Sequence, residues 1–567
     1  MKEDIYRSHN LVIFNFAQRY FNDVQDLANS GYFTAFLSDY IEHTKKHQDE
    51  FYQFLVADGK KDTAAKELTR LFKMLYVFEI KDCEHPYLRD LAIMDSIVED
   101  IYNYWRKFQR FSLIHADSGS DNQSARFIDS DTRFNNLVIG FYRAIQEKIR
   151  GSKNRVYRQL QAGTNAAVVL RDFKTKLPES YYEKLKKIPF IDAMMLRTPL
   201  ILYPKSNKRE GKFIELKENP LNTFRFNKDE WMIYPAKVGT LLAFIYFHRD
   251  FLPSIVALSG LFELAADFDC ANRCPDLILL FGNQDDKDAV CYYDDRQNNL
   301  VIGSVSYNAD KIDYFGYLKK TTLTLHNIRA IADGDLPIHG AMINISFKSG
   351  IKKGVVIVGD SGAGKSESIE ALQNLASDRI EKMDIIYDDM GKMFIKDGEV
   401  YCSGTEIGAF IRLDDLEKGS PYKDMDRSIF FNPHLSNARL VLPVNSYKEV
   451  IKAHRVDMML YANNYTADLG IKRFNSFEEA KEVFIAGKRI ALGTTDEKGL
   501  TQTYFANPFG PMQRQNQCDK IFDKTFKQLF NNDIFVGEIY SHLGLSDNNV
   551  GLNKAAEELL RVLEGTQ

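Results

Sequence analysis

The chain has 567 residues, of which 44% are hydrophobic and 27% are charged, and its formal net charge is -4. This length exceeds what one hydrophobic core usually serves, and the composition is too apolar for a disordered chain, so we expect two or three folded domains. The balanced charge lacks the basic excess that nucleic acids or an anionic membrane surface would attract, so we expect neither as a partner. Any anion site must therefore be local.

Six cysteines are scattered along the chain, which argues against a disulfide framework and favours a reducing, cytoplasmic location. Cys270 and Cys274 stand close together, but no second Cys or His pair follows at the spacing of a zinc site, so we expect free thiols. The first ten residues, MKEDIYRSHN, have neither the basic start nor the apolar core of a signal peptide. Charged residues at 248–250 interrupt the longest apolar stretch, so we expect no membrane span.

Residues 1–117 predict a helical N-terminal region, because apolar residues recur there at three- and four-residue spacing, as at 91–105. The stretch 118–131 is rich in Ser, Asp and Asn and has few large apolar residues, which is typical of a linker. Residues 132–300 mix helix and strand signals, so we expect an α/β domain that contributes substrate contacts. Its expected elements are helices at 134–150 and near 238–266, strands at 165–170 and 277–281, and a hairpin over 289–307.

A phosphate-binding pattern occurs in the remaining part, 301–567. The run GVVIVGDSGAGKSES has the form G-x-x-x-x-G-K-[ST] at 359–366, directly after an apolar run and before a helical segment. In such a P-loop the backbone N–H groups converge on the phosphates, the lysine meets the β- and γ-oxygens, and the last hydroxyl ligates Mg²⁺ or Mn²⁺. We therefore expect a bound nucleoside triphosphate and a divalent metal. The predicted nucleotide-binding residues are Gly359, Asp360, Ser361, Gly362, Ala363, Gly364, Lys365, Ser366 and Glu367.

Polar residues on either side of the P-loop could complete this site. Downstream, MDIIYDDMG has Asp388 and Asp389 at the end of an apolar run, where a second parallel strand would bring carboxylates beside the P-loop metal. Upstream, Lys319 and Lys320 stand in YFGYLKK and His339 stands in LPIHGAMINI. Taken alone, an Asp pair is more often a turn or a helix cap, paired lysines are usually solvated, and a single histidine is usually structural. Only the P-loop between them favours a functional role.

The stretch 314–389 resembles phosphoenolpyruvate carboxykinases of the ATP-using type. Their pattern runs Y-x-G-E-x-K-K, then a metal-binding His, a G-x-S-G-x-G-K-[ST] loop and an Asp-Asp pair, and this sequence has Tyr314 to Lys320, His339, 359–366 and Asp388-Asp389 in that order. A weaker likeness continues at NARLVLPVN, where Arg439 matches an Arg that meets the γ-phosphate. The run at 484–510 is similar to the family's base-binding T-E-R-G segment, which implies that Thr494, Thr495, Asp496 and Gly499 lie near adenine.

The resemblance implies an α/β carboxykinase-like P-loop domain at 301–567 with the active site in a cleft beside the 132–300 domain. It implies an enzyme that converts oxaloacetate and ATP to phosphoenolpyruvate, ADP and CO₂, through an enolate that attacks the γ-phosphate, with Mn²⁺ or Mg²⁺ and no organic cofactor. A lysine that ligates the metal must be neutral, which requires a depressed pKa. The implied roles are Lys320, His339, Ser366, Asp388 and Asp389 for metal, Tyr314, Lys320 and Ser361 for substrate, and Lys319, Lys365 and Arg439 for the transferring phosphoryl group.

This sequence also departs from the family's pattern. Tyr317 stands in place of the Glu before the lysines, Met390 follows the Asp pair, and Glu367 replaces the second loop hydroxyl, so the substrate is left open. Guanine-specific carboxykinases carry a Cys inside the loop, whereas this chain has Ala363. The family's carboxylate-clamping Arg has no clear match, and the candidates are Arg155 and Arg158. A mobile lid that excludes water is expected at 413–426.

Two alternatives remain open. IHGAMI followed by GVVIVGDSGAGKSES is also similar to HPr kinase/phosphorylases, in which the first Asp of the pair acts as general base on a protein serine, so Asp388 would activate an alcohol. The other alternative is a non-catalytic nucleotide sensor, although binding alone does not require both lysines, His339 and both aspartates. The oligomeric state is not predicted.

Overall fold

The chain has the mixed α/β architecture expected from the sequence, divided between two compact units. A computed structural model describes residues 3–56, 61–116, 123–152, 161–178, 182–206, 209, 213–285, 287–360, 362–375, 379–412, 428–431, 438–492, 498–545 and 550–565. Unit 1 comprises Met1–Arg171 and Ile191–Leu200, and unit 2 comprises Asp172–Phe190 and Ile201–Gln567. The boundary expected at 300/301 falls inside unit 2, at the first residue of strand β13 (Leu300–Ser306).

Unit 1 combines a helical bundle with strands. Apolar residues on successive helical turns form its core, and α5 begins where the Asp90 side chain accepts hydrogen bonds from Ala92 and Ile93. β1 and β2 are antiparallel, whereas β2, β3 and β4 are parallel neighbours. The helices are α1 (Val24–Ala28), α2 (Gly31–His47), α3 (Asp49–Leu55), α4 (Lys61–Val77), α5 (Leu91–Lys107) and α6 (Gln123–Arg150), and the strands are β1 (Ile5–Ser8), β2 (Leu11–Asn15), β3 (Gln109–His115), β4 (Ala166–Arg171) and β5 (Phe190–Leu196).

Two expectations for this region need correction. The 1–117 region contains β1, β2 and β3 as well as helices, because short, continuously buried strands have no alternating pattern that would reveal them. The second part of the expected linker, 123–131, belongs to α6, and 118–122 lies outside the described residues. The polar composition of this stretch was misleading because Asp131 is fully buried and forms an ion pair of 2.6 Å with Arg197.

The first sheet of unit 2 runs in the order β8-β9-β11-β13-β12-β7, and β10 pairs with β8. The hairpin predicted over 289–307 is confirmed, since β12 and β13 are antiparallel. The helix predicted near 238–266 is wrong in its first half, where β9 is a strand, because a strand buried on both faces has the same unbroken apolar run as a buried helix. The elements are β7 (Phe213–Glu215), β8 (Trp231–Val238), β9 (Leu241–His248), α7 (Leu252–Leu258), β10 (Glu263–Leu264), α8 (Asp267–Asn272), β11 (Leu277–Asn283), β12 (Val290–Asp295), β13 and α9 (Phe315–Asp333).

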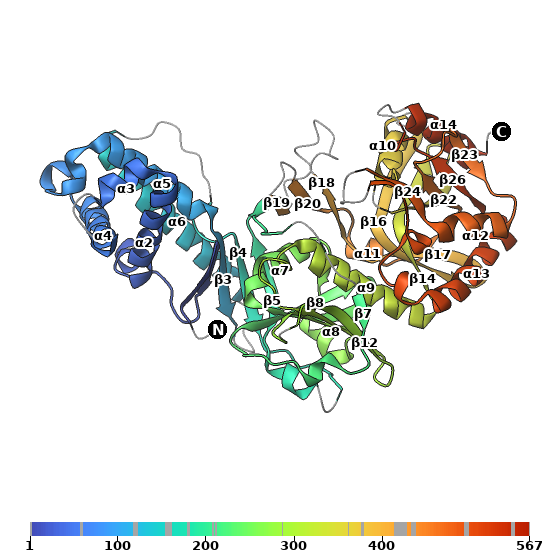
Figure 1. The fold of residues 1–567 in the computed structure, drawn as a ribbon, viewed down its shortest axis with the longest axis horizontal. Coiled ribbons are helices and arrows are strands. Elements are labelled where there is room, and N and C mark those ends of the chain that lie inside the picture. Colours follow the sequence, from blue (N-terminus) through green and yellow to red (C-terminus); the bar gives the residue numbers. More distant parts are fainter. Residues whose placement is uncertain are drawn as a thin grey trace. The chain divides into compact units, whose positions relative to one another are not determined.

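The second sheet carries the P-loop and runs in the order β21-β17-β16-β14-β15-β22-β26-β23. Alternate residues of β15 face opposite sides, with Val355 packed toward α10 and α14 and Val356 packed toward α12 and α13, so helices cover both faces (Figure 1). The elements are β14 (Leu336–Phe347), β15 (Lys352–Val358), α10 (Lys365–Leu375), β16 (Ile380–Lys396), β17 (Glu399–Gly404), α11 (Tyr447–Val450), β21 (His454–Arg455), β22 (Met458–Asn463), β23 (Gly470–Arg473), α12 (Phe477–Ala486), α13 (Gln515–Asn531), β26 (Phe535–Tyr540) and α14 (Val550–Glu564).

Two smaller sheets complete unit 2. One contains β18 (Gly408–Arg412), β20 (Ala438–Pro443) and β19 (Ser428–Phe431), with β6 (Leu200–Leu202) beside β19. The other is the hairpin of β24 (Lys488–Leu492) and β25 (Lys498–Gln502). Within the described part of the chain, no helix has the length and apolarity needed to cross a lipid bilayer.

Candidate functional site

The P-loop joins β15 to α10, as the sequence predicted. Gly362 and Gly364 have φ angles of 79° and 100°, which a residue with a side chain rarely adopts. A Cβ on Gly364 would also lie 2.6 Å from Ser541 Oγ, so only glycine fits there. Lys365 begins α10, is buried, and donates to the carbonyl oxygen of Asp360 at 3.3 Å. Backbone and lysine are thus arranged around the helix N-terminus, where phosphate oxygens bind.

The Asp pair lies within β16, which corrects the expectation that it ends a strand. β14 is antiparallel to both β15 and β16, so β15 and β16 run in the same direction but are separated by β14. Asp388 still reaches the P-loop, because Ser366 Oγ donates to its two carboxylate oxygens at 3.1 and 3.3 Å. Hydroxyl and carboxylate oxygens are the donors that Mg²⁺ takes beside nucleotide phosphates.

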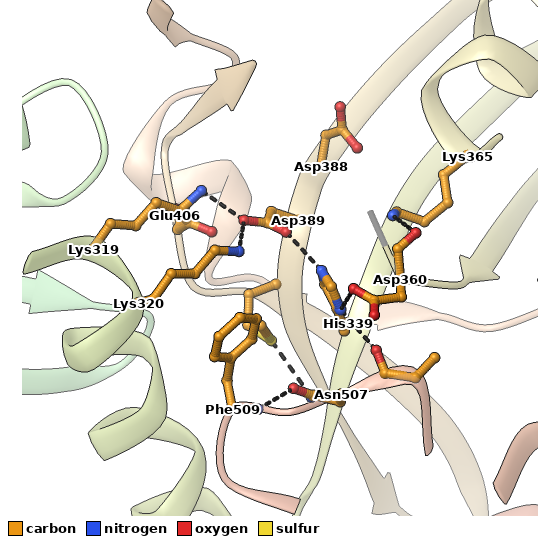
Figure 2. A network of polar contacts seen from close by, with 12 residues as sticks. Lys319, Lys320, His339, Asp360, Lys365, Asp388, Asp389, Glu406, Asn507 and Phe509 are labelled. Carbon is orange, nitrogen blue, oxygen red and sulfur yellow. Dashed lines mark hydrogen bonds and ion pairs between the residues drawn. The ribbon is translucent and has the colours of Figure 1, made fainter. Parts of the chain in front are cut away.

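Asp389 is the centre of a buried cluster of charges. Lys319 and Lys320, neighbours on α9, donate to its Oδ2 at 2.6 and 2.9 Å, and Figure 2 shows both side chains extending toward it. His339 Nε2 lies 3.0 Å from its Oδ1. Glu406 adds an ion pair of 3.0 Å with Lys319. The side chains of Lys319 and His339 are 0% exposed, so these charges interact in a region with little water to screen them.

Burial and charge shift several pKa values in this cluster. Burial opposes the charge of Asp389, but Lys319 and Lys320 outweigh it and hold the pKa of this carboxyl well below its usual range. Burial, together with the adjacent Lys319, lowers the pKa of Lys320 despite the attraction of Asp389. Burial also raises the pKa of Glu406 to about 7. A lowered pKa favours the neutral amine of Lys320, the form that can bind a metal ion.

The orientation of His339 follows from its second hydrogen bond. Its Nδ1 lies 2.8 Å from the carbonyl oxygen of Ala506, and a carbonyl only accepts, so Nδ1 carries the hydrogen. Nε2 therefore faces Asp389 either as a second N–H or as a lone pair beside a carboxylate oxygen. An imidazole nitrogen and a carboxylate oxygen converging in this way are suitable donors for a divalent cation. Among the described residues, no group of three or more His, Cys, Asp or Glu side chains could hold a metal.

The segment that was compared with a base-binding region reaches the P-loop. Arg489 forms an ion pair of 3.1 Å with Asp360, and Thr503 donates to the same carboxylate oxygen at 3.2 Å. Gly499 lies exposed in β25. The predicted residues that lie outside the described part of the chain are Thr494, Thr495, Asp496, Ser361, Arg155, Arg158 and the expected lid at 413–426.

Two phenylalanine rings each contact one lysine of the pair and one arginine. The Phe410 ring lies 5.8 Å from Lys319 Nζ, 5.7 Å from the guanidinium of Arg439 and 6.4 Å from the ring of Tyr314. The Phe509 ring lies 4.4 Å from Lys320 Nζ and 5.6 Å from the guanidinium of Arg209. The structure thus places the predicted residues Tyr314, Arg439 and Lys319 around the same ring.

Neither arginine forms an ion pair with a residue that the structure describes. Burial lowers the pKa of Arg209, against the opposing effect of the phenols of Tyr317 and Tyr314. A partly buried cation is stabilised when an anion joins it, so Arg209 and Arg439 could both bind an anionic ligand. Sequence reasoning missed Arg209, Glu406 and Phe509. A short basic run, SNKRE, was the sole local signal for Arg209, and nothing local marks the other two.

Comparisons with protein families and with curated proteins identified no relative of this chain. No protein-family model matches the chain, and no curated protein is significantly similar to it. All the described residues of the site belong to unit 2.

Proposed function

We propose that this chain is an ATP-dependent phosphoenolpyruvate carboxykinase-like enzyme, which converts oxaloacetate and ATP to phosphoenolpyruvate, ADP and CO₂ with Mg²⁺ or Mn²⁺. One observation carries the proposal: the Nζ atoms of the adjacent Lys319 and Lys320 meet on Asp389, the next residue after the carboxylate that binds the P-loop hydroxyl. A P-loop needs no such lysine pair to bind a nucleotide, whereas a dianionic acceptor beside the γ-phosphate requires cations there.

The nucleotide would bind with its phosphates on the P-loop backbone and Lys365. Ser366 and Asp388 would hold one divalent metal together with the phosphate oxygens, and Lys320, His339 and Asp389 would hold a second. A metal at these positions would supply Lewis-acid stabilisation of the charge that develops on oxygen. The direct sequence of strand, P-loop and helix, with β14 beside the strand and β16 beyond β14, supports a carboxykinase-like P-loop fold.

Arg209 and Arg439, which have no acidic partner among the described residues, suit the carboxylates of oxaloacetate. Arg209 would clamp a substrate carboxylate, the role for which the sequence suggested Arg155 and Arg158, since it lies near Tyr314 and contacts the same Phe509 ring as Lys320. An arginine fork binds a carboxylate through two parallel hydrogen bonds and fixes its orientation. Arg439 and Lys319, on the Phe410 ring, would stabilise the negative charge of the transferring group. Burial of Lys319 limits the water that competes for these contacts.

A second candidate is a kinase that phosphorylates a hydroxyl group, as the likeness to HPr kinase/phosphorylases implies. Burial raises the pKa of Asp388 against the opposing charge of Lys365. A carboxylate with a raised pKa beside the P-loop is suited to accept a proton from an alcohol, so Asp388 would act as the general base. In this function, the lysine pair would serve only to stabilise charge.

A coupled assay for phosphoenolpyruvate tests the proposal. Oxaloacetate and ATP are supplied with Mn²⁺ or Mg²⁺, and the Lys320→Met and Asp389→Asn variants are compared with the wild type. We expect the wild type to form phosphoenolpyruvate and ADP, and each variant to lose about 100-fold or more in rate, as when a charge-stabilising group is removed. Lys352→Met is a matched control, because Lys352 is exposed at the start of β15 and should not affect the rate.

The opposite outcome is equally clear. ATP binding without phosphoenolpyruvate would contradict the carboxykinase proposal. Phosphorylation of a serine-containing protein acceptor, abolished by Asp388→Asn, would then establish the second candidate.

A further inference from the structure

The ring of Phe509 is surrounded by three side chains of the site. Lys320 Nζ lies 4.4 Å from its centroid, the Arg209 guanidinium lies 5.6 Å away, and the His339 ring lies edge-on at 5.7 Å. Figure 2 shows the ring beneath Lys320, next to His339. Phe509 comes from the loop between β25 and α13, far in sequence from the other three residues.

The backbone holds this ring in one place. Asn327 of α9 donates to the carbonyl oxygen of Phe509 at 2.6 Å, and the N–H of Phe509 donates to the side chain of Asn507 at 3.0 Å. Gly510 has a φ angle of 106°, and a Cβ there would lie 2.5 Å from the Cβ of Asn327. The loop is therefore pressed against the helix that carries the lysine pair.

The backbone of the same loop is strained at a residue that contacts His339. Phe505 and Ala506 are consecutive non-glycine residues with φ angles of 52° and 49°, and both are 0% exposed. Such conformations persist where the surrounding structure enforces them, and they concentrate at functional sites. The carbonyl oxygen of Ala506 is the acceptor that orients His339. The loop thus fixes His339 by hydrogen bonding and contacts two cations through an aromatic face.

We propose that Phe509 is a positioning residue that aligns Lys320 and Arg209 for a ligand bearing a carboxylate; this inference rests on the proposed function. An aromatic face attracts cations through its quadrupole but does not neutralise them. A carboxylate in the same place would pair with the arginine and occupy its hydrogen-bond donors. The ring therefore contacts both side chains without occupying the hydrogen-bond donors of Arg209, which an anion could then use.

Oxalate, a small dicarboxylate, is the probe for this test. Its affinity for the full chain with Mg²⁺ is measured by calorimetry, and the affinity for a fluorescent ATP analogue is measured alongside. Phe509→Leu retains an apolar side chain but removes the aromatic face, so we expect oxalate to bind about 2- to 30-fold more weakly, with nucleotide affinity unchanged. Phe509→Trp restores an aromatic face and should recover oxalate binding.

Phe394→Leu is the matched control. Phe394 also has a lysine against its ring, with Lys392 Nζ at 5.9 Å, but lies outside the cluster further along β16. This variant should bind oxalate like the wild type.

Three results would overturn the inference. If Phe509→Leu binds oxalate as tightly as the wild type, or if Phe509→Trp binds as weakly as Phe509→Leu, the ring face does not align the cations, and the proposed function stands. If the wild type itself does not bind oxalate, the substrate site fails and the inference fails with it.

Discussion

His326, on the same helix as the lysine pair, is a buried base that should make unit 2 sensitive to acid. Its side chain is 0% exposed, its Nδ1 lies 2.9 Å from the side-chain oxygen of Asn327, and its Nε2 has no hydrogen-bond partner among the described residues. Burial lowers its pKa to about 3, against the smaller opposing effect of Asn327. The folded protein therefore keeps this imidazole neutral at any moderately acidic pH.

The sign and size of the effect follow from proton linkage. The unfolded chain takes up a proton at His326 near pH 6.5, whereas the folded chain does so only near pH 3, so stability present above pH 6.5 is lost as the pH falls. Between pH 7 and pH 5 the unfolded state gains most of one proton and the folded state almost none. Integrating over this interval, we expect His326 alone to lower the free energy of unfolding by about 2 kcal/mol.

The two tryptophans allow unit 2 to be measured separately. Trp105 belongs to unit 1 and Trp231 to unit 2, so a Trp105→Phe background leaves fluorescence that reports on unit 2. Urea unfolding is followed at pH 7 and pH 5 with His326 present or replaced by Leu. Because leucine does not titrate, His326→Leu should lose about 2 kcal/mol less than the wild type between the two pH values. Comparing these losses cancels the contributions of other titrating groups.

A control separates this linkage from simple destabilisation. Thr324→Val changes another fully buried residue of α9 without adding or removing a titrating group, and should retain the wild-type loss. Equal losses in the wild type and His326→Leu would refute the reasoning, because they would mean that the folded state can protonate His326 at an ordinary pH.

Two further predictions concern stability. In β14, a Cβ on Gly340 would lie 2.4 Å from the backbone oxygen of Ile357, so Gly340→Ala should lower the free energy of unfolding in urea by about 1–3 kcal/mol. Gly140→Ala is the control, because a Cβ there would have nothing within 4 Å, and it should not destabilise the protein. Equal stability of both variants would contradict the close approach of β14 and β15. Burial raises the pKa of Asp313 to about 6, so its ionisation lowers the stability of the folded state as the pH rises from 4 to 7. Over that range, the free energy of unfolding of Asp313→Asn should rise by about 2 kcal/mol relative to that of the wild type. If the difference between the two free energies stayed constant, Asp313 would titrate normally.

The local parts of the site could be predicted from the sequence. The P-loop is contiguous, and its glycines, lysine and hydroxyl have roles set by backbone geometry within eight residues, so the order of strand, loop and helix was correctly expected. The hairpin of β12 and β13 was likewise visible, because alternation and an Asn-rich turn are local signals. Each of these features depends on residues that are neighbours in the chain.

The strand β9 and the polar start of α6 show where such signals fail. The run LLAFIYFH is apolar at every position but the last, and whether it forms a helix or a strand depends on the neighbours β8 and β11 that bury it. The stretch at 123–131 has the composition of a linker, but Asp131 is buried because Arg197, 66 residues away, neutralises it. In both cases the deciding partner lies far away in sequence.

The sequence by itself determined that this protein has a P-loop, an α/β architecture and a set of polar residues suited to phosphoryl transfer. Only the tertiary structure decided which of them meet: the antiparallel register of β14 and β16 brings His339 to Asp389, and the packing of α9 brings the lysine pair to the same carboxylate, 70 residues away from Lys319. Arg209, Glu406 and Phe509 join the site only through this packing. The reason is physical: backbone conformation follows from neighbouring residues, whereas burial, charge pairing and pKa depend on which distant side chains the fold brings together.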